Sequence, residues 1–391
     1  MTGRDPGTEY RNRTLLPLVS ASYLIFGVGL GGFQLKLADI AREFNMHYTA
    51  MGSLVTMLYI AIMIAPVFSG YLSDRFGKKK FMALAFAIYI AGGALAALTH
   101  NVVILYIGIF CIGAGAGMIE CIGTAALSDS HPEKAEKNIN LSESFYSGGA
   151  AIGPFVIAAM ISAGAGWRAL FIVPAILIVF LLPLLRITEF TVREPVGGHE
   201  LERQSLFSLL KSKLLMLLVI CIMIYVGVET VIAYFIDSFF SVELGGQAFS
   251  AAAISLYWLA MTVSRILFGL INTNTHIVLM VTYGLTAVLL ALLALSGHAV
   301  AALVICIILG FVLGSIWPML MALATKRFSA SSGTVAGILV AGSGLGGMLF
   351  PILMGIVADN SGLRWAMSML VLISVVAFVC CVIIFRGREQ R

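Results

Sequence analysis

Charged residues are scarce in this sequence. Asp, Glu, Lys and Arg make up 11% of its 391 residues, while 60% are apolar and the mean hydropathy is +1.02. Soluble domains average roughly a quarter charged residues, so the composition excludes a water-soluble globular enzyme. A membrane span needs about 20 mostly apolar residues, so the chain has room for about twelve spans and little else. No polar stretch is long enough for a separate catalytic domain.

Signals for metal binding, secretion and nucleotide binding are also missing. The six cysteines lie inside apolar stretches without metal-ligand spacing, so we interpret them as buried apolar residues. The first apolar run starts near Leu15 and is too long for a signal-peptide core. The net charge of +5 lies in loops beside apolar runs, so no nucleic-acid partner is expected. We expect no cofactor, and without a nucleotide-binding loop transport must use an ion or solute gradient.

The apolar runs predict an all-α membrane protein with twelve transmembrane helices. In lipid only a helix or a closed barrel satisfies its own backbone hydrogen bonds, and these runs lack the alternation of barrel strands. The predicted spans are 15–40, 48–73, 80–98, 102–128, 139–163, 167–186, 213–240, 247–271, 276–295, 299–325, 332–358 and 363–386. The longest polar interval, 187–212, divides them six and six. It predicts a cytoplasmic linker between a bundle at 1–186 and a second bundle at 213–391.

The distribution of basic residues predicts the orientation in the membrane. If both termini lie in the cytoplasm, 20 of the 24 Lys and Arg residues fall on the inner side. Only Lys36, Arg42, Arg168 and Arg364 fall on the outer side. Because cytoplasmic loops carry an excess of Lys and Arg, we expect a multi-pass protein of the bacterial inner membrane with both termini inside. The expected partners are the lipid bilayer and a small-molecule substrate, and we expect a monomer.

An internal repeat supports the division into two halves. Two sets of residues recur with an offset of 197 positions, which favours a duplicated six-helix unit. The first set is Gly113, Gly117, Glu120 and Thr124, which recurs as Gly310, Gly314, Trp317 and Met321. The second set is Gly149 and Pro154, which recurs as Gly346 and Pro351.

The most specific motif is residues 70–80, Gly-Tyr-Leu-Ser-Asp-Arg-Phe-Gly-Lys-Lys-Lys, between the second and third predicted helices. It resembles, almost residue for residue, the signature loop of the major facilitator superfamily. That resemblance covers the whole chain and implies two bundles that rock about a central site. In that family the loop helps lock the halves in the outward-facing state. The resemblance implies a gating network of Asp74 and Arg75, with Asp129 as partner and Arg265 from a reduced copy of the motif.

Two acidic residues lie deep in predicted spans, Glu120 and Glu229. A charge at that depth costs several kcal/mol unless it is paired or faces a wet cavity, so each is a hypothetical functional site. Glu120 shares a helical face with Gly113 and Gly117 and is predicted to carry a proton or contact substrate. Glu229 lies one turn after Tyr225 and is predicted to contact substrate or relay a proton. The alternative for both is a structural carboxyl that bonds a neighbouring helix.

Three further residues are predicted substrate contacts. Gln34 both donates and accepts hydrogen bonds, which suits a polar uncharged ligand. Tyr225 would cover the apolar face of a sugar or drug beside Glu229. Trp317 occupies the repeat position of Glu120 and would form a stacking wall, with plain packing as the alternative.

Residues 115–120, Gly-Ala-Gly-Met-Ile-Glu, and 140–145, Asn-Leu-Ser-Glu-Ser-Phe, resemble the fucose–galactose–glucose:proton symporter branch. That branch carries a coupling Glu where Glu120 stands, and an acidic residue near the position of Gln34. The resemblance implies proton-coupled symport of a sugar or similar small polar solute. Proton-driven efflux of a drug or metabolite is the main alternative, with uniport, sodium coupling and lipid transport also open. A membrane enzyme or receptor is the alternative from another class, but no His/Asp/Ser cluster at membrane depth supports an enzyme.

Overall fold

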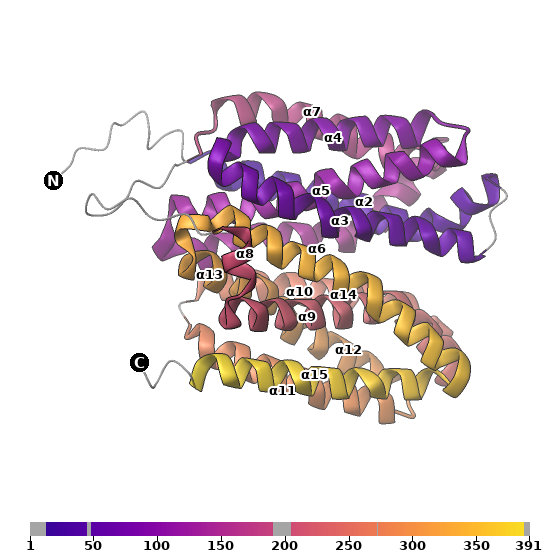
Figure 1. Cartoon of the computed structure of the whole chain (residues 1–391). Coiled ribbons are helices and arrows are strands. Elements are labelled where there is room, and N and C mark those ends of the chain that lie inside the picture. Colours follow the sequence, from indigo (N-terminus) through magenta and orange to yellow (C-terminus); the bar gives the residue numbers. More distant parts are fainter. Residues whose placement is uncertain (1–12, 45–47, 191–204, 272, 387–391) are drawn as a thin grey trace. The chain divides into compact units, whose positions relative to one another are not determined.

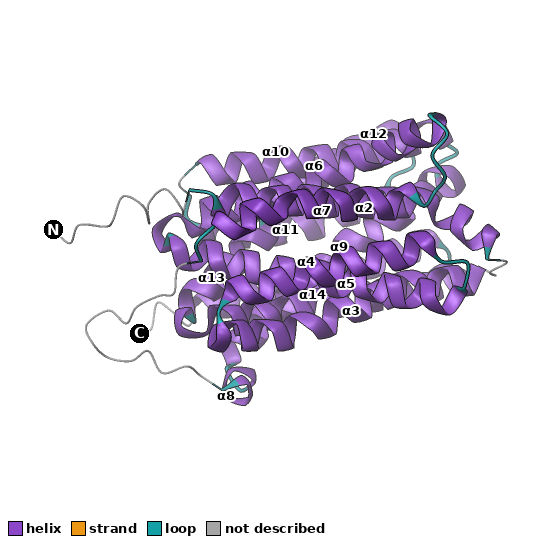
Figure 2. Cartoon of the chain, turned by 90° about the horizontal axis from the view of Figure 1, so that it is seen from above, coloured by secondary structure: helices purple, strands orange, loops and turns teal. Residues whose placement is uncertain are grey.

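The computed structural model describes residues 13–44, 48–190, 205–271 and 273–386, with a few side chains inside helices, including that of Gln34, left out. The described residues form helices joined by short loops, without a β-strand (Figures 1 and 2). The first half holds α2 (Leu15–Glu43), α3 (Tyr48–Phe76), α4 (Lys78–Leu98), α5 (Val102–Ser130), α6 (Ala135–Ser162) and α7 (Ala169–Ile187). The second half holds α8 (Leu206–Leu210), α9 (Lys213–Ser238), α10 (Gln247–Leu270), α11 (Thr275–Leu295), α12 (Ala299–Gly314), α13 (Ile316–Arg327), α14 (Ser332–Ser361) and α15 (Leu363–Arg386).

The predicted all-α fold class is confirmed. Among the described residues, eleven candidate spans are long and apolar enough to cross a membrane, and α12 and α13 together form one of them. The remaining predicted span corresponds to α6, whose first half carries polar side chains such as Glu136 and Asn140. The largest difference from the predicted spans is at 299–325, which is two helices, α12 and α13, that meet at Ser315.

Capping side chains explain why several helices begin where they do. Asn101 accepts a hydrogen bond from the Val103 N–H at the start of α5, and Asn274 accepts one from the His276 N–H at the start of α11. Each cap satisfies one of the N–H groups that have no partner in the first turn. These polar residues therefore end the loops and start the apolar helices.

The described chain divides into two compact units. The first comprises Met1–Leu206 and Ala322–Ala341, and the second comprises Phe207–Met321 and Gly342–Arg391. The boundary at Leu206 falls inside the interval 187–212 that we expected to be a linker. The segment Ala322–Ala341, which we call the crossover segment, differs from expectation, because it lies in the second half of the sequence but packs in the first unit.

The internal repeat corresponds to equivalent packing within each unit. A Cβ added at Gly113 of α5 would lie 2.5 Å from a backbone carbonyl oxygen of α3, and one at Gly310 of α12 would lie 2.3 Å from a carbonyl oxygen of α10. Likewise, a Cβ added at Gly149 of α6 would lie 2.5 Å from a carbonyl oxygen of α2, and one at Gly346 of α14 would lie 2.1 Å from a carbonyl oxygen of α9. The repeated glycines therefore allow helix backbones to approach closely.

An arginine also fastens three helix ends in the first unit. Arg168, just before α7, donates two hydrogen bonds to Glu43 at the end of α2, at 2.6 and 3.0 Å. It donates a third to the Thr99 carbonyl after α4, at 3.1 Å. The bidentate Arg168 guanidinium holds the pKa of the Glu43 carboxyl below its usual value. We call this arrangement the arginine clasp.

The second unit repeats the arginine clasp. Arg364, at the start of α15, donates to Glu243, which follows α9, at 3.0 Å, and to the Ser296 carbonyl after α11, at 2.8 Å. In both units the arginine at the start of the last membrane helix (α7 or α15) joins the end of the first membrane helix (α2 or α9) to the turn after the third (α4 or α11). Arg168 and Arg364 are two of the four basic residues predicted for the outer side.

Candidate functional site

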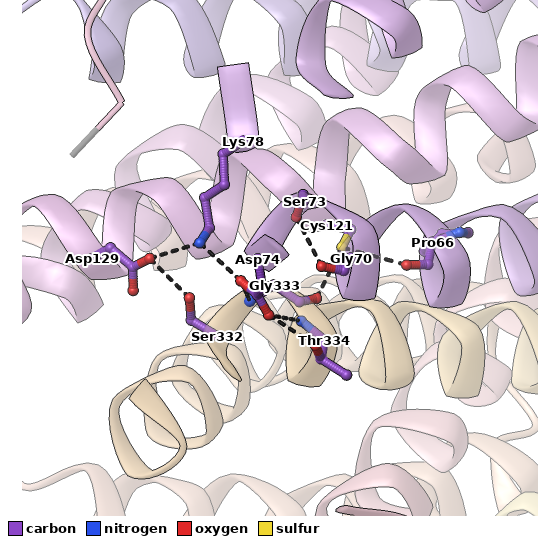
Figure 3. Close-up of polar contacts among 10 residues, drawn as sticks. All are labelled: Pro66, Gly70, Ser73, Asp74, Lys78, Cys121, Asp129, Ser332, Gly333 and Thr334. Atoms are coloured by element: carbon purple, nitrogen blue, oxygen red, sulfur yellow. Dashed lines mark hydrogen bonds and ion pairs between the residues drawn. The ribbon is translucent and has the colours of Figure 1, made fainter. Parts of the chain in front are cut away.

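The first candidate site surrounds the carboxylate of Asp74 in the last turn of α3 (Figure 3). Asp74 accepts hydrogen bonds from the Gly333 N–H at 3.0 Å, the Thr334 N–H at 2.7 Å and the Thr334 hydroxyl at 2.8 Å. Both N–H groups belong to the first turn of α14, where they have no partner inside the helix and carry partial positive charge. Through these bonds to the N-terminus of α14, Asp74 therefore binds the crossover segment.

Lys78 connects Asp74 to a second carboxylate. Its ammonium group lies 3.0 Å from Asp74 Oδ1 and 2.9 Å from Asp129 Oδ2, and the Ser332 hydroxyl donates to Asp129 at 2.9 Å. The side chains of Asp74, Lys78 and Asp129 are 6%, 11% and 4% exposed. Two buried carboxylates share one ammonium group, so the α14 N-terminus supplies the remaining positive potential.

Glycines let α14 approach α3 closely enough for these bonds. A Cβ at Gly70 would lie 2.2 Å from the Gly333 carbonyl oxygen, and one at Gly337 would lie 2.2 Å from the Pro66 carbonyl oxygen. Gly77 has φ of 100°, a conformation that favours glycine and turns the chain directly from α3 into α4. The glycines of the predicted motif therefore have a packing role and a turn role.

The predicted gating residues separate into two groups. Asp74 and Asp129 come together through Lys78. Arg75 is exposed and stacks on the Tyr71 ring at 4.5 Å, so the cation beside Asp74 is Lys78 instead. Arg265 belongs to the second unit and contacts Glu229, because it lies on α10 and points into the packing of that unit. The motif in the second half therefore does not supply a counterpart of Asp74.

The second candidate site is the cluster of Tyr225, Glu229 and Arg265 inside the second unit. The Tyr225 hydroxyl donates to Glu229 Oε2, and Arg265 Nη2 donates to the Tyr225 oxygen at 3.2 Å. Arg265 Nη2 also lies 3.8 Å from Glu229 Oε2. Arg265 is 1% exposed and Glu229 is 8% exposed, so this ion pair is buried. The structure thus brings together two predicted substrate contacts and a residue that we had assigned to the gate.

Glu120 lies half-buried on α5, in the first unit. Tyr23 donates to the Glu120 backbone carbonyl at 3.0 Å and forms a hydrogen bond with the Thr124 hydroxyl at 3.0 Å, which fixes this turn of α5 against α2. Gly113 and Gly117, on the same face, pack directly against α3. The small-residue face therefore serves helix packing, while Glu120 itself is half-buried.

The other predicted substrate contacts are divided between the units. The side chain of Gln34 lies outside the described residues, although its backbone belongs to α2. Trp317 is 3% exposed, near the start of α13. A small apolar cavity in the first unit is lined by residues including Phe26, Phe33 and Tyr89.

Sequence reasoning missed three features of these sites. Lys78 follows Asp74 by four positions, so helical spacing could have identified it as the partner. Arg265 as the partner of Glu229 had no local signal, since the two residues are 36 positions apart. The role of Ser332 and Thr334 required the position of α14. Among the described residues, no group of His, Cys, Asp and Glu side chains could hold a metal ion.

Comparison with known proteins gives a consistent family. The model of the Major Facilitator Superfamily matches residues 19–340 and 277–391. A Protein TsgA homolog of Yersinia enterocolitica is 23% identical over 391 residues, 95% of each chain. A Protein TsgA homolog of Buchnera aphidicola is 21% identical over 354 residues, 88% of each chain.

Solved structures share the fold. The Escherichia coli fucose:proton symporter FucP matches with a TM-score of 0.78 and 18% identity, over 94% of this chain and 98% of its own. The human organic anion transporter MFSD10 matches with 0.76 and 14%, over 97% and 100%. The proton:xylose symporter XylE matches with 0.74 and 15%, over 95% of both chains.

Proposed function

The chain belongs to the Major Facilitator Superfamily, and from this premise we propose that it imports a sugar or similar small polar solute together with protons. The family and the fold indicate a multi-pass membrane transporter rather than an enzyme. In our proposal it lies in the bacterial inner membrane with both termini in the cytoplasm. Its two halves expose a central site alternately to each side.

The buried pair of Glu229 and Arg265 is the observation that carries the proposal. Inside a membrane such a charge is retained when it is paired and serves transport. Protonation of Glu229 removes its negative charge, so the Arg265 guanidinium loses its ionic partner and depends on other hydrogen-bond acceptors. The pair therefore responds to the same ion that would drive uptake. In the proposal Glu120 is the second proton-coupling carboxyl, because it lies in residues 115–120, which resemble the sugar:proton symporter branch.

The printed names of the structural neighbours support a sugar as the first substrate class to test. FucP is a fucose:proton symporter and XylE a proton:xylose symporter. We propose Gln34, Tyr225 and Trp317 as substrate contacts beside the two carboxyls. The aromatic rings would cover the apolar face of a sugar ring while Gln34 pairs with its hydroxyls.

The gate of this transporter is proposed to be the Asp74 site. The bonds from Asp74 to the α14 N-terminus must break and form again in each cycle if the crossover segment changes partners. Lys78, which also pairs with Asp129, would keep the Asp74 carboxylate oriented while the segment is released.

Uptake into proteoliposomes tests the proposal. Radiolabelled fucose and xylose are offered to vesicles with an alkaline interior, with and without sodium. One pH unit supports up to about tenfold accumulation per proton, and we expect accumulation that collapses when an ionophore removes the gradient. Glu229→Gln should lose accumulation. Accumulation only with an acidic interior would favour proton-driven exchange and contradict symport, and sodium dependence would contradict proton coupling.

A further inference from the structure

The membrane helix formed by α12 and α13 is interrupted at Ser315, three residues before Pro318. Pro318 has no N–H, so the Gly314 carbonyl, four residues earlier, has no helical partner. The α-helix ends at Gly314 and starts again at Ile316. Because lipid offers no water to satisfy such a carbonyl, another protein group must do so.

Arg265 satisfies it. Its Nε–H donates to the Gly314 carbonyl at 3.0 Å. Gly314 packs so closely on α10 that an added Cβ would lie 2.7 Å from the Met261 carbonyl oxygen, which brings the break within reach of Nε. Nη2 of the same guanidinium contacts Tyr225 and Glu229. One buried side chain therefore bridges the ionisable cluster and the helix break.

The break between α12 and α13 is connected through α13 to the crossover segment, which Asp74 binds. α13 starts in the second unit, which extends to Met321, and continues in the first unit as part of the crossover segment. The same segment carries Gly333 and Thr334, whose N–H groups bond Asp74. A change of direction at Gly314 would thus be transmitted by α13 to the segment that Asp74 holds.

We propose that Arg265 is a positioning residue that transmits the charge state of Glu229 to the break between α12 and α13, and through α13 to the crossover segment. This inference rests on the proposed function, in which Glu229 gains and loses a proton. When Glu229 is neutral, the Arg265 charge depends on its remaining acceptors, so its bond to the Gly314 carbonyl strengthens.

The surroundings of the cluster contain few competing groups. Among the described residues, Arg265 of α10 and Tyr225 of α9 face Glu229, which is itself on α9, and Tyr257 of α10 faces Tyr225. The hydroxyls of Ser264 and Ser315, next in sequence to Arg265 and Gly314, are buried and have no hydrogen-bond partner among the described atoms. They are additional acceptors for a guanidinium released by Glu229.

A double-mutant melting cycle tests the link between Arg265 and the break. Arg265→Lys keeps the charge but its single ammonium cannot serve both Glu229 and Gly314, so the full-length protein should melt about 3–6 °C lower. Pro318→Ala returns the missing N–H to Gly314 and should recover at least half of that loss. Pro174→Ala, at a proline inside α7 of the first unit, is the matched control and should recover none.

Additive losses in this cycle would overturn the proposal, as would equal recovery by Pro174→Ala. If Arg265→Lys alone does not fold, the yield of monodisperse protein replaces the melting temperature. Recovery of yield with Pro318→Ala and not with Pro174→Ala then supports the link, and the reverse or equal recovery rejects it.

Trp317 reports on the break when the other three tryptophans, Trp167, Trp258 and Trp365, are replaced by Phe. We expect its emission maximum to shift between pH 5 and 9 in the purified protein, and the shift to disappear in Glu229→Gln and in Pro318→Ala. Glu120→Gln, which removes the proposed proton-coupling carboxyl of the first unit, should retain the shift. A shift that persists in Glu229→Gln, or no shift in the parent, would overturn the proposal.

Neither the melting cycle nor the Trp317 fluorescence measurement requires a transported solute. If fucose and xylose are not transported, the proposed substrate fails while the role of Arg265 is still decided. If transport is confirmed but the melting cycle is additive, the proposed function stands and this inference fails.

Discussion

At the scale of single residues, Asp74 illustrates how one carboxylate joins distant parts of the chain. It meets three donors of α14 and the ammonium of Lys78, and its neighbours Gly70 and Gly333 leave no room for a side chain. An amide in its place has one acceptor oxygen and presents an N–H₂ group to other donors.

Asp74→Asn should therefore slow transport and leave substrate affinity almost unchanged. Loss of a charged hydrogen bond weakens the contact by about 1.5–3 kcal/mol, so the state that contains it loses population and the maximal rate falls about tenfold or more. The KM for the transported sugar should stay within about threefold. Uptake kinetics measure both, and a collapse of affinity at an unchanged rate would refute the gating role. Arg75→Gln, at the exposed neighbour, should change the rate less.

At the scale of helices, the arginine clasp explains why each bundle keeps its helix ends together. Two independent copies, around Arg168 and Arg364, join corresponding helix ends in the two units. Since the arginines bind backbone carbonyls as well as carboxylates, lysine is a poor replacement for either.

The clasp of the first unit predicts a pH-dependent contribution to stability. The folded pKa of Glu43 is lowered, chiefly by its hydrogen bond from Arg168, so its contribution is present above the unfolded pKa, about 4.3, and is lost as the pH falls through the folded value. Because the Glu43 side chain is 36% exposed, the effect is small, about 1–2 °C in melting temperature. Glu43→Gln should remove this part of the difference in melting temperature between pH 7 and pH 3. Glu133→Gln, at an exposed carboxyl, is the control, and an equal effect there would contradict the clasp.

The apolar pattern of the sequence did not predict the break between α12 and α13. Residues 299–325 read as one continuous span, and Pro318, with Gly314 and Ser315 before it, is a local sign of an interruption. Whether a proline bends or ends a membrane helix depends on which group satisfies the released carbonyl. Here that group is on α10, so only packing could reveal it.

At the scale of the whole molecule, coupling can be separated from movement of solute. Glu120→Gln mimics the protonated state, so it should abolish gradient-driven accumulation while solute exchange across the vesicle membrane is partly retained. Counterflow of radiolabelled fucose against unlabelled fucose measures exchange, and uptake under a pH gradient measures accumulation. Normal accumulation by the variant would exclude Glu120 as the proton carrier.

The sequence by itself determined the class of molecule and the approximate ends of its helices. These follow from local properties, since an apolar run of about 20 residues must be helical in lipid and a polar cap or glycine ends it. The motif also led to Asp74 as a candidate functional position, because its residues are contiguous in the chain.

Only the tertiary structure decided which side chains share a site. In the structure Lys78 pairs with Asp129, and Arg265 pairs with Glu229 instead of with the predicted gating residues. The crossover segment packs in the first unit. A buried charge takes whichever partner the packing brings within a few ångströms, and sequence separations of 36 to 260 residues carry no record of that proximity.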